Sequence, residues 1–473
     1  VIMYKLSRWI CIILLLALMM DTIDSLSENI GNFSSLPVCS GEDNIVLSHA
    51  FYNSDPKKMI KFDGSNCPDD VWLLTMQENN LINGKFQGIF VNIGFNKGYN
   101  FANWINVFAP WGDVTPANWY TKLKSIRSEG DLCGVCHDCL TEFKPPQSTA
   151  VKNANYVLVG VDINNGNIEL SKRAFCPKSY TNDCIKTSSE GTISLHLIQA
   201  AGGEHNGNLF VPKCAIGDEL CRVPDNATEM SREELHDKYH VEVEYIPAVS
   251  VDQLMHNLTL DHSITNTLLQ SVHNTFFSHI PHSSNNDLEE GNTPTTVAID
   301  ILMIDTEGHD ALVIKGSKHL IKKQAIRCIV FEYHEFNPWP SFKLEDIMNY
   351  LDEHGMDCYF QGFSRLWPIT GSCWHNNYEF HQWSNVMCIL RKDPWHEALQ
   401  KYVMTVTGLR GSDLIQEGSL IKFTNSRSVY RVEKGKKRPF SSGRVFLEHG
   451  YDFDDVKVVD IVYSYILPDG DSY

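Results

Sequence analysis

The sequence predicts an α/β protein built on a doubly wound, mostly parallel sheet, followed by a small β module. Two observations predict the sheet. From residue 86 to about residue 391, short β-branched runs alternate with helical stretches, which is the pattern of βαβ units. Glycine-rich or acidic segments follow several of these runs, where open α/β sheets place their ligands. The module is indicated by a change to short strands and turns after Gly418.

Length and composition limit the classes of function. A chain of 473 residues with 43% hydrophobic and 11% aromatic content can bury a large core and should hold more than one domain. Its formal net charge of -18 repels phosphate backbones, and no basic stripe runs along the sequence. We therefore expect no nucleic-acid partner.

The N-terminal segment indicates the secretory pathway. An apolar run, Trp9–Met20, follows two basic residues and precedes small residues, so we predict a signal peptide over residues 1–27. An uncleaved anchor is the alternative, and only an anchor would attach the protein to a membrane. The run has about a dozen residues, short of the roughly 20 that a spanning helix needs. Glycosylation acceptor patterns at Asn32, Asn226 and Asn257 agree with a secreted protein or one retained in the Golgi lumen.

Cysteine usage points to the same compartment, because 14 cysteines are many for a reduced cytosolic enzyme of this length. Removal of Cys11 with the signal peptide leaves an odd number, which predicts one free thiol or an intermolecular bridge. The dense cluster Cys133–Cys139 also suggests a zinc or iron–sulfur site with His137, but we favour disulfides because a second tight pair is missing. We expect Cys358, Cys373 and Cys388 to form disulfides.

The elements follow from hydrophobic periodicity. The clearest strands of the sheet are expected over residues 88–93, 156–161, 192–200, 297–304 and 326–332. Amphipathic helices are expected over residues 316–324 and 343–354, and another from residue 394 to about 407. The resulting divisions are a cap region at 28–85, the α/β domain at 86–395 with a surface insertion at 262–296, a helical connector at 396–417 and the β module at 418–473.

The first candidate motif lies where the first strand ends. An apolar strand runs into Gly-x-Asn-x-Gly, a tight turn on which a nucleotide-like cofactor can lie because glycine lets the backbone approach a ligand. The cofactor-binding candidates in this motif are Asn92, Gly94, Asn96 and Gly98. The second strand ends at Asp162, where an acidic side chain can accept hydrogen bonds from ribose hydroxyls.

The second candidate motif consists of acidic residues and histidines at the ends of two later strands. Asp305, Glu307 and His309 follow one strand, and Glu332 and His334 end the next. Open α/β sheets place their sites at these carboxyl ends, so we expect the two groups to meet.

These residues carry a family resemblance. The run Asp305-Thr306-Glu307-Gly308, followed by the strand that ends Glu332-Tyr333-His334, resembles the signature of the FkbM methyltransferases. The resemblance covers roughly residues 86 to 392, and the glycine turn is similar to the family's first cofactor motif. It implies a Rossmann-like class I methyltransferase sheet and S-adenosyl-L-methionine as cofactor. Asn92 departs from the class I methyltransferases, which usually carry an acid there.

The resemblance implies an O-methyltransferase. The compartment makes a sugar hydroxyl of a glycan the most natural acceptor, ahead of another hydroxyl-bearing small molecule. We expect Asp305 and Glu307 at the methyl-transfer site, with His309, Glu332 or His334 as general base. In one alternative, Asp305 or Glu307 only caps the following helix. In another, Asp305, Glu307 and Glu332 hold magnesium; we assign no metal.

Two other classes of function remain open. The fold can persist in a catalytically inactive secreted binding protein, an interpretation that Asn92 favours. An oxidoreductase with a nicotinamide dinucleotide would need a Gly-x-Gly-x-x-Gly turn, which the sequence lacks. Aromatic residues between Phe360 and Trp383 could stack on sugar faces, but core packing is the expected role for most of them.

Overall fold

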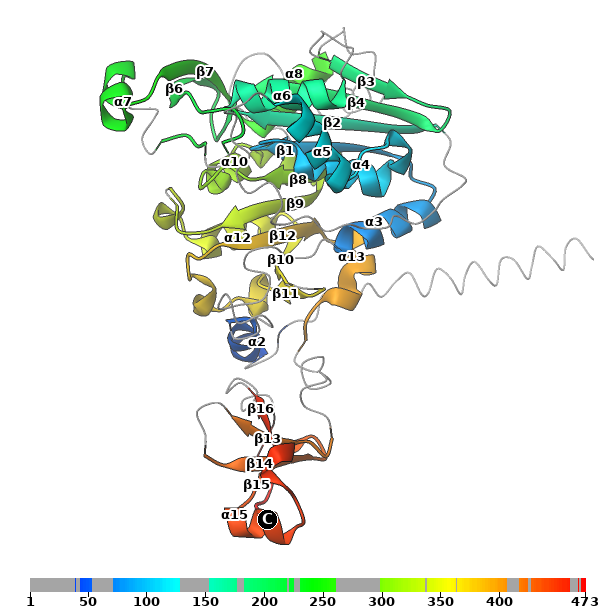
Figure 1. Cartoon of the computed structure of the whole chain (residues 1–473), viewed down its shortest axis with the longest axis vertical. Helices are drawn as coiled ribbons and strands as arrows, with labels where there is room; N and C mark the ends of the chain where they lie inside the picture. The colour runs from blue at the N-terminus through cyan, green and yellow to red at the C-terminus, as the bar shows by residue number, and fades with distance from the viewer. Residues whose placement is uncertain are drawn as a thin grey trace, which may run out of the picture. The chain divides into compact units, whose positions relative to one another are not determined.

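The computed structural model consists mainly of a nine-stranded sheet with helices around it and a separate four-stranded sheet near the C-terminus (Figure 1). The description covers residues 39, 43–52, 71–127, 153–176, 183–218, 221–224, 230–260, 298–336, 338–362, 364–405, 417–423, 427–459, 467 and 469–473. The signal peptide, the surface insertion and the Cys133–Cys139 cluster that the sequence predicts therefore lie outside the described residues.

The strands of the large sheet lie in the order β11-β10-β12-β9-β8-β1-β2-β4-β3. Their bounds are β1 Gln87–Ile93, β2 Ala154–Asp162, β3 Asp183–Thr187, β4 Gly191–Gln199, β8 Ile299–Ile304, β9 Ile326–Tyr333, β10 Met356–Gln361, β11 Leu366–Pro368 and β12 Ser384–Leu390. Apolar side chains of β1, β2, β8 and β9 are almost completely buried. Such continuous apolar runs are expected of parallel strands that are covered on both faces.

The sheet is mixed, so the expectation of a mostly parallel sheet is not confirmed. Among the described strands, β4, β2, β1, β8 and β9 are parallel neighbours, whereas the remaining neighbours, β3 on one flank and β12, β10 and β11 on the other, pair antiparallel. Short connections explain part of the difference. Only a few residues separate β3 from β4 and β10 from β11, and so short a loop can join antiparallel strands but not parallel ones.

The direction of strand addition reverses at β1. The chain runs from β1 to β2 and then β4 on one side, and it returns to lay β8 and β9 on the other side (Figure 1). β1 and β8 are neighbours, but after β1 the chain continues to one side of the sheet and after β8 it continues to the other side. Open α/β sheets bind their ligands in the crevice at such a switch point.

The helices have clear local causes. α5 begins with a capping box between Thr115 and Asn118, and α6 is capped by Asn164, whose side chain accepts backbone N–H groups of the first turn. The helices span α2 Asp43–Tyr52, α3 Val71–Ile82, α4 Tyr99–Phe108, α5 Pro116–Ile126, α6 Asn165–Phe175, α7 Arg232–Tyr239, α8 Val251–Leu260, α10 Asp310–Lys315, α11 Lys318–Lys322, α12 Leu344–Glu353, α13 Pro394–Leu399 and α15 Gly443–Glu448.

The helix expected from residue 394 to about 407 is shorter than predicted. α13 ends at Leu399, and a 3-10 turn follows over Gln400–Tyr402. Val403 then forms an isolated bridge with Leu366 of β11. Pairing with the sheet edge thus takes precedence over the helical propensity of this segment.

A small sheet of order β5-β7-β6 lies beside the large one. Its strands are β5 Ala201–Gly202, β6 Gly207–Pro212 and β7 Val243–Val249. Ala201, Leu209, Val211 and Ile246 form its buried cluster, and Val223 packs against that cluster.

Disulfides connect several of these elements. Cys176–Cys184 joins the end of α6 to β3, Cys214–Cys221 closes the loop after β6, and Cys358–Cys388 joins β10 to β12. Cys39 and Cys373 are also disulfide-bonded. The prediction that Cys358, Cys373 and Cys388 form disulfides is therefore confirmed. Among the described cysteines, Cys328 is free and buried.

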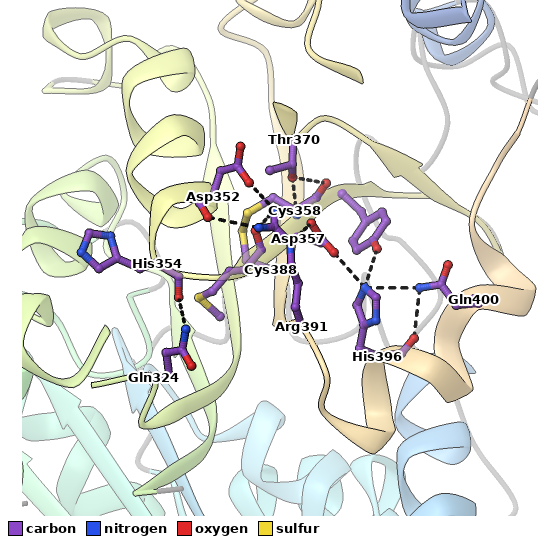
Figure 2. A network of polar contacts seen from close by, with 12 residues as sticks. Gln324, Asp352, His354, Asp357, Cys358, Thr370, Cys388, Arg391, His396 and Gln400 are labelled. Carbon is purple, nitrogen blue, oxygen red and sulfur yellow. Dashed lines mark hydrogen bonds and ion pairs between the residues drawn. A yellow bond between two sulfur atoms is a disulfide. The ribbon is translucent and has the colours of Figure 1, made fainter. Parts of the chain in front are cut away.

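A polar network braces the antiparallel flank beside the Cys358–Cys388 disulfide. Figure 2 shows Asp357 of β10 between Arg391 and His396. Its carboxylate accepts from Arg391 Nε at 2.7 Å and lies 2.9 Å from His396 Nε2. Asp357 is buried, so two nitrogen partners offset its desolvation and fix α13 against the sheet.

The C-terminal sheet has its own core. Its order is β15-β14-β13-β16, with β13 Leu420–Phe423, β14 Val429–Glu433, β15 Lys436–Pro439 and β16 Lys457–Val459. Ile421, Phe423, Val432, Val459 and Leu467 form one of its buried clusters. Within the described ranges of the whole chain, no helix is both long and apolar enough to cross a membrane.

Candidate functional site

The turn after β1 is shaped by three residues with positive φ. Gly94, Asn96 and Gly98 have φ of 82°, 51° and 77°, a region that glycine adopts readily and asparagine tolerates. Gly94 is also needed for space, because a Cβ atom there would lie 1.7 Å from the backbone oxygen of Asp305. The backbone N–H of Asp305 donates to Ile93 O at 2.8 Å. The loops after β1 and β8 are therefore in direct backbone contact.

Asp162, at the end of β2, fastens the turn to its neighbour. One carboxylate oxygen accepts the backbone N–H of Asn96 at 2.6 Å, and the other accepts that of Asn164 at 2.7 Å. Burial raises the pKa of Asp162 to about 6, although these two hydrogen bonds act in the opposite direction. The carboxylate is thus mostly ionised at neutral pH and holds two loops at the pocket.

The loop after β8 carries the acidic motif. Glu307 has φ of 53° and Gly308 has φ of 114°, so the chain turns sharply before α10. Asp310 is fully buried and fixes the turn: its carboxylate accepts from the Thr306 hydroxyl at 3.1 Å, from Gly308 N at 3.3 Å and from Glu332 N at 3.2 Å. One side chain therefore ties the loop to β9.

Two carboxyl groups of this region have raised pKa values. Burial, followed by the nearby charge of Asp305, raises the pKa of Asp310 to about 7. Burial, followed by the charges of Asp305, Glu307 and Asp310, raises the pKa of Glu332 well above its ordinary value. A cluster of like charges in a desolvated place is typical of a site that binds a cation or moves a proton.

His334 and Trp383 lie near Glu332. The Trp383 side chain is hydrogen-bonded to the Glu332 carboxyl group. The Nδ1 atom of His334 accepts the Phe336 backbone N–H at 3.1 Å, which places the proton of the neutral ring on Nε2. Burial, followed by the positive charge of Arg222, lowers the pKa of His334 to about 4, so the ring is neutral at physiological pH.

A pocket opens at the carboxyl ends of β1, β2, β4 and β8, and it brings the two sequence motifs together. Among the predicted residues, Gly94, Asn96, Asp162, Asp305, Glu307 and His309 line it. Asn92, Gly98, Glu332 and His334 do not line it. Asn92 is fully buried within β1, and Glu332 is coupled to the pocket through the charges of Asp305 and Glu307. The functional roles of all these residues remain predictions.

One wall of the pocket could not be predicted from the sequence. Asp218, Cys221, Arg222 and Val223 line it and belong to or directly follow the loop that the Cys214–Cys221 disulfide closes. Two cysteines seven residues apart were the available signal, but nothing local indicates where such a loop docks.

Four hydrogen bonds hold this loop over the strand ends. Asn164 Nδ2 donates to Ala215 O at 2.8 Å, and Lys97 Nζ donates to Gly217 O at 3.1 Å. Asn167 accepts the Gly217 N–H at 2.6 Å through Oδ1 and donates through Nδ2 to the backbone oxygen of Asp218 at 3.2 Å. The loop is therefore anchored on both the glycine turn and α6.

In the described part of the chain, no group of three or more His, Cys, Asp or Glu side chains is arranged to hold a metal ion.

Comparison with known proteins addresses the acidic motif directly. Residues 224–358 match a family model described as the methyltransferase FkbM domain. This region includes β8, the loop with Asp305 and Glu307, and β9, whereas the glycine turn and Asp162 precede it. No curated protein and no solved structure gives a significant match. The resemblance that the motifs carry is confirmed over residues 224–358, which are similar to the methyltransferase FkbM domain.

Proposed function

We propose that the protein is an S-adenosyl-L-methionine-dependent O-methyltransferase of the secretory pathway that methylates a sugar hydroxyl of a glycan. One observation carries the proposal. The pocket at the switch point of the sheet combines the glycine turn, Asp162 and the acidic loop of the FkbM domain. This is the crevice in which open α/β sheets hold nucleotide-like ligands.

The pocket residues fit the cofactor. Asp162 uses each oxygen for one backbone N–H, and a carboxylate has about four acceptor positions, so it can still accept hydrogen bonds from ribose hydroxyls. Gly94 leaves no side chain between the turn and the loop after β8. When bound, S-adenosyl-L-methionine supplies an electrophilic methyl group on a sulfonium cation. Asp305 and Glu307 give the pocket the negative charge that suits such a cation.

Methyl transfer to a hydroxyl requires removal of a proton. We assign the general base to His309, because it is the candidate base that lines the pocket, half-buried beside Asp305 and Glu307. Glu332 can adjust the total charge beside the pocket by gaining or losing a proton, since the charges of Asp305 and Glu307 raise its pKa. His334 acts as an N–H donor instead of a base, because its Nδ1 already accepts a backbone N–H.

The compartment and the acceptor follow from different observations. Disulfides at Cys176–Cys184, Cys214–Cys221 and Cys358–Cys388 suit a secreted or lumenal protein. Asn257, which begins a glycosylation acceptor pattern, is exposed on α8. In that compartment, the hydroxyl groups of glycans are abundant acceptors, which supports a sugar hydroxyl as the substrate.

Calorimetric titration with S-adenosylhomocysteine tests the cofactor site. The oxidised wild type should bind, and Asp162→Ala should bind at least about tenfold more weakly because a charge-assisted hydrogen bond worth about 1.5–3 kcal/mol is lost. Asp237→Ala, which removes an exposed carboxylate on α7, is the matched control and should bind like the wild type. Absence of binding by the folded wild type would remove the basis for the enzyme.

Asn92 favours one other function, a catalytically inactive binding protein with this fold. Its side chain is buried within β1, and neither amide atom has a hydrogen-bond partner. The same titration separates the two functions, because an inactive relative that has lost the cofactor would show no heat of binding. Binding of the cofactor product together with methyl transfer from labelled S-adenosyl-L-methionine to a glycan would eliminate the inactive alternative.

A further inference from the structure

Among the described residues that line the pocket, Arg222 is the one lysine or arginine. Four carboxylates line the same pocket, those of Asp162, Asp218, Asp305 and Glu307. Arg222 directly follows Cys221, so the disulfide and the hydrogen bonds of the 214–221 loop fix the position of its backbone. A single cationic side chain in an otherwise acidic pocket indicates that it binds an anionic group of a second ligand, because the cofactor itself is a cation.

The surroundings of Arg222 place it on the side of the pocket toward β9. Its Cζ atom lies 4.9 Å from the centre of the Phe336 ring, and its charge acts on His334. Phe336 and His334 both follow β9, which β8 separates from the cofactor turn after β1. Arg222 therefore lies on the β9 side of the pocket, next to Phe336 and His334.

His334 does not line the pocket itself, but its ring packs against Phe336 beside Arg222 and carries an unsatisfied donor. Its side chain is nearly buried, with 4% of the residue exposed, and its Nε2 atom has no hydrogen-bond partner. Since Nδ1 accepts from Phe336, Nε2 carries the proton of the neutral ring. A buried N–H without an acceptor is unfavourable, and an oxygen atom of a ligand would supply the missing partner.

Exposed aromatic rings complete the region. Trp383 is 47% exposed, although its side chain is hydrogen-bonded to Glu332, and Phe336 is 38% exposed. Trp367 and Tyr378, from the same aromatic-rich stretch as Trp383, are fully buried core residues. An indole that stays exposed beside a carboxyl cluster is suited to pack against the apolar face of a sugar ring.

We infer that the methyl acceptor is a sugar that carries an anionic group, with Arg222 and His334 Nε2–H binding the anion and Trp383 packing on the ring. The guanidinium fork matches a carboxylate, a sulfate or a phosphate, so the shared property is the anion. This inference rests on the proposed function and adds the substrate class to it.

The test uses the full, oxidised chain saturated with S-adenosylhomocysteine. Calorimetry compares methyl glucuronoside, glucose 6-sulfate and glucose 6-phosphate with uncharged methyl glucoside, so that the preferred anion identifies its own class. We expect at least one anionic sugar to bind about tenfold or more tightly than the uncharged one, which corresponds to about 1.4 kcal/mol. Arg222→Gln should abolish this preference, and Arg222→Lys should retain part of it.

Two further variants sharpen the result. Arg232→Gln removes an exposed arginine at the start of α7 and should leave the preference unchanged. Trp383→Ala should weaken charged and uncharged sugars by the same factor, because both sugars lose the same ring contact and the Trp383–Glu332 hydrogen bond is absent in both titrations.

The outcomes separate the inference from the function on which it rests. A protein that binds S-adenosylhomocysteine but shows no preference for any anionic sugar overturns the inference alone, as does a preference that survives Arg222→Gln. A folded protein that does not bind S-adenosylhomocysteine overturns the proposed function and the inference together.

Discussion

The two ends of β8 and β9 carry buried charge in opposite ways. At the amino ends, Asp300 accepts from Lys85 at 2.6 Å and from Arg327 at 3.0 Å, and Arg327 also binds both oxygens of Asp393 at 2.8 Å. Burial would raise the pKa of Asp300, but Lys85 and Arg327 hold it below its ordinary value. The Arg327 guanidinium also lies 3.7 Å from the Trp395 ring centre.

At the carboxyl ends, the donors to buried Asp310 are neutral: the Thr306 hydroxyl and the backbone N–H groups of Gly308 and Glu332. Neighbouring carboxylates add to the effect of burial there, and the pKa values of Asp310 and Glu332 rise. The difference separates two uses of the same strands. Charges at one end are paired, so that removal of one partner would leave a buried charge uncompensated, whereas charges at the other end are clustered and suit a site.

Breaking the paired end should have the largest effect on stability. Arg327→Met leaves Asp300 and Asp393 buried without their shared partner, so we expect a loss of about 3–5 kcal/mol in the free energy of unfolding. Chemical denaturation followed by circular dichroism measures it. Arg444→Met, at an exposed arginine paired with Glu448, should change the value by less than about 0.5 kcal/mol. Equal effects of the two substitutions would show that the network does not stabilise the fold.

Adding a side chain to the turn after β1 should weaken cofactor binding strongly, with a smaller effect on folding than Arg327→Met. Gly94→Ala places a Cβ atom against the Asp305 backbone oxygen, so we expect S-adenosylhomocysteine affinity to fall by about a hundredfold or more, the equivalent of about 2.8 kcal/mol. Gly84→Ala is the control, since Gly84 also has positive φ but nothing within 4 Å of its Cβ position. If Gly94→Ala bound S-adenosylhomocysteine with normal affinity, close contact between the loops after β1 and β8 would not be required for binding.

The raised pKa at the clustered end predicts a pH dependence of stability. Between the unfolded pKa of Asp310, near 3.8, and its folded pKa, about 7, the folded state binds the extra proton. Asp310 therefore stabilises the fold most below pH 4, and this contribution falls by up to about 1.4 kcal/mol per unit as pH rises toward 7. Asp310→Asn should flatten this part of the curve measured by denaturation. Asp300, with its lowered pKa, should behave oppositely and lose its contribution as pH falls below about 4.

Loosening the disulfide loop should give the smallest effect. Asn167→Ala removes hydrogen bonds to Gly217 and Asp218, and we expect S-adenosylhomocysteine to bind about three- to tenfold more weakly, or about 1 kcal/mol. Asn118→Ala, in the capping box of α5, is the control for an asparagine outside the pocket and should lower stability without changing affinity. An unchanged affinity in Asn167→Ala would show that the loop does not shape the pocket.

Local sequence patterns predicted the parts of the fold that depend on local forces. The apolar runs that became β1, β2 and β9 and the Asp305–Gly308 motif required only periodicity and family likeness to locate. The antiparallel flank of β12, β10 and β11 was not anticipated, because its pairing is set by contacts between distant segments.

The site was predicted in part for the same reason. Gly94 and Asp162 could be found because they follow strands whose ends meet at a switch point. Arg222 could not, because its place depends on how the Cys214–Cys221 loop docks on Asn164 and Asn167, an interaction spread over about 50 residues of separation.

The Cys214–Cys221 disulfide has a consequence for when the protein becomes competent. A disulfide, which forms only after the chain is synthesised, helps to hold one wall of the pocket. The pocket is therefore incomplete in the newly synthesised chain. We expect oxidation of these two thiols to complete the pocket, so protein produced in a reducing cytosol should contain folded molecules in which this wall is not yet fixed.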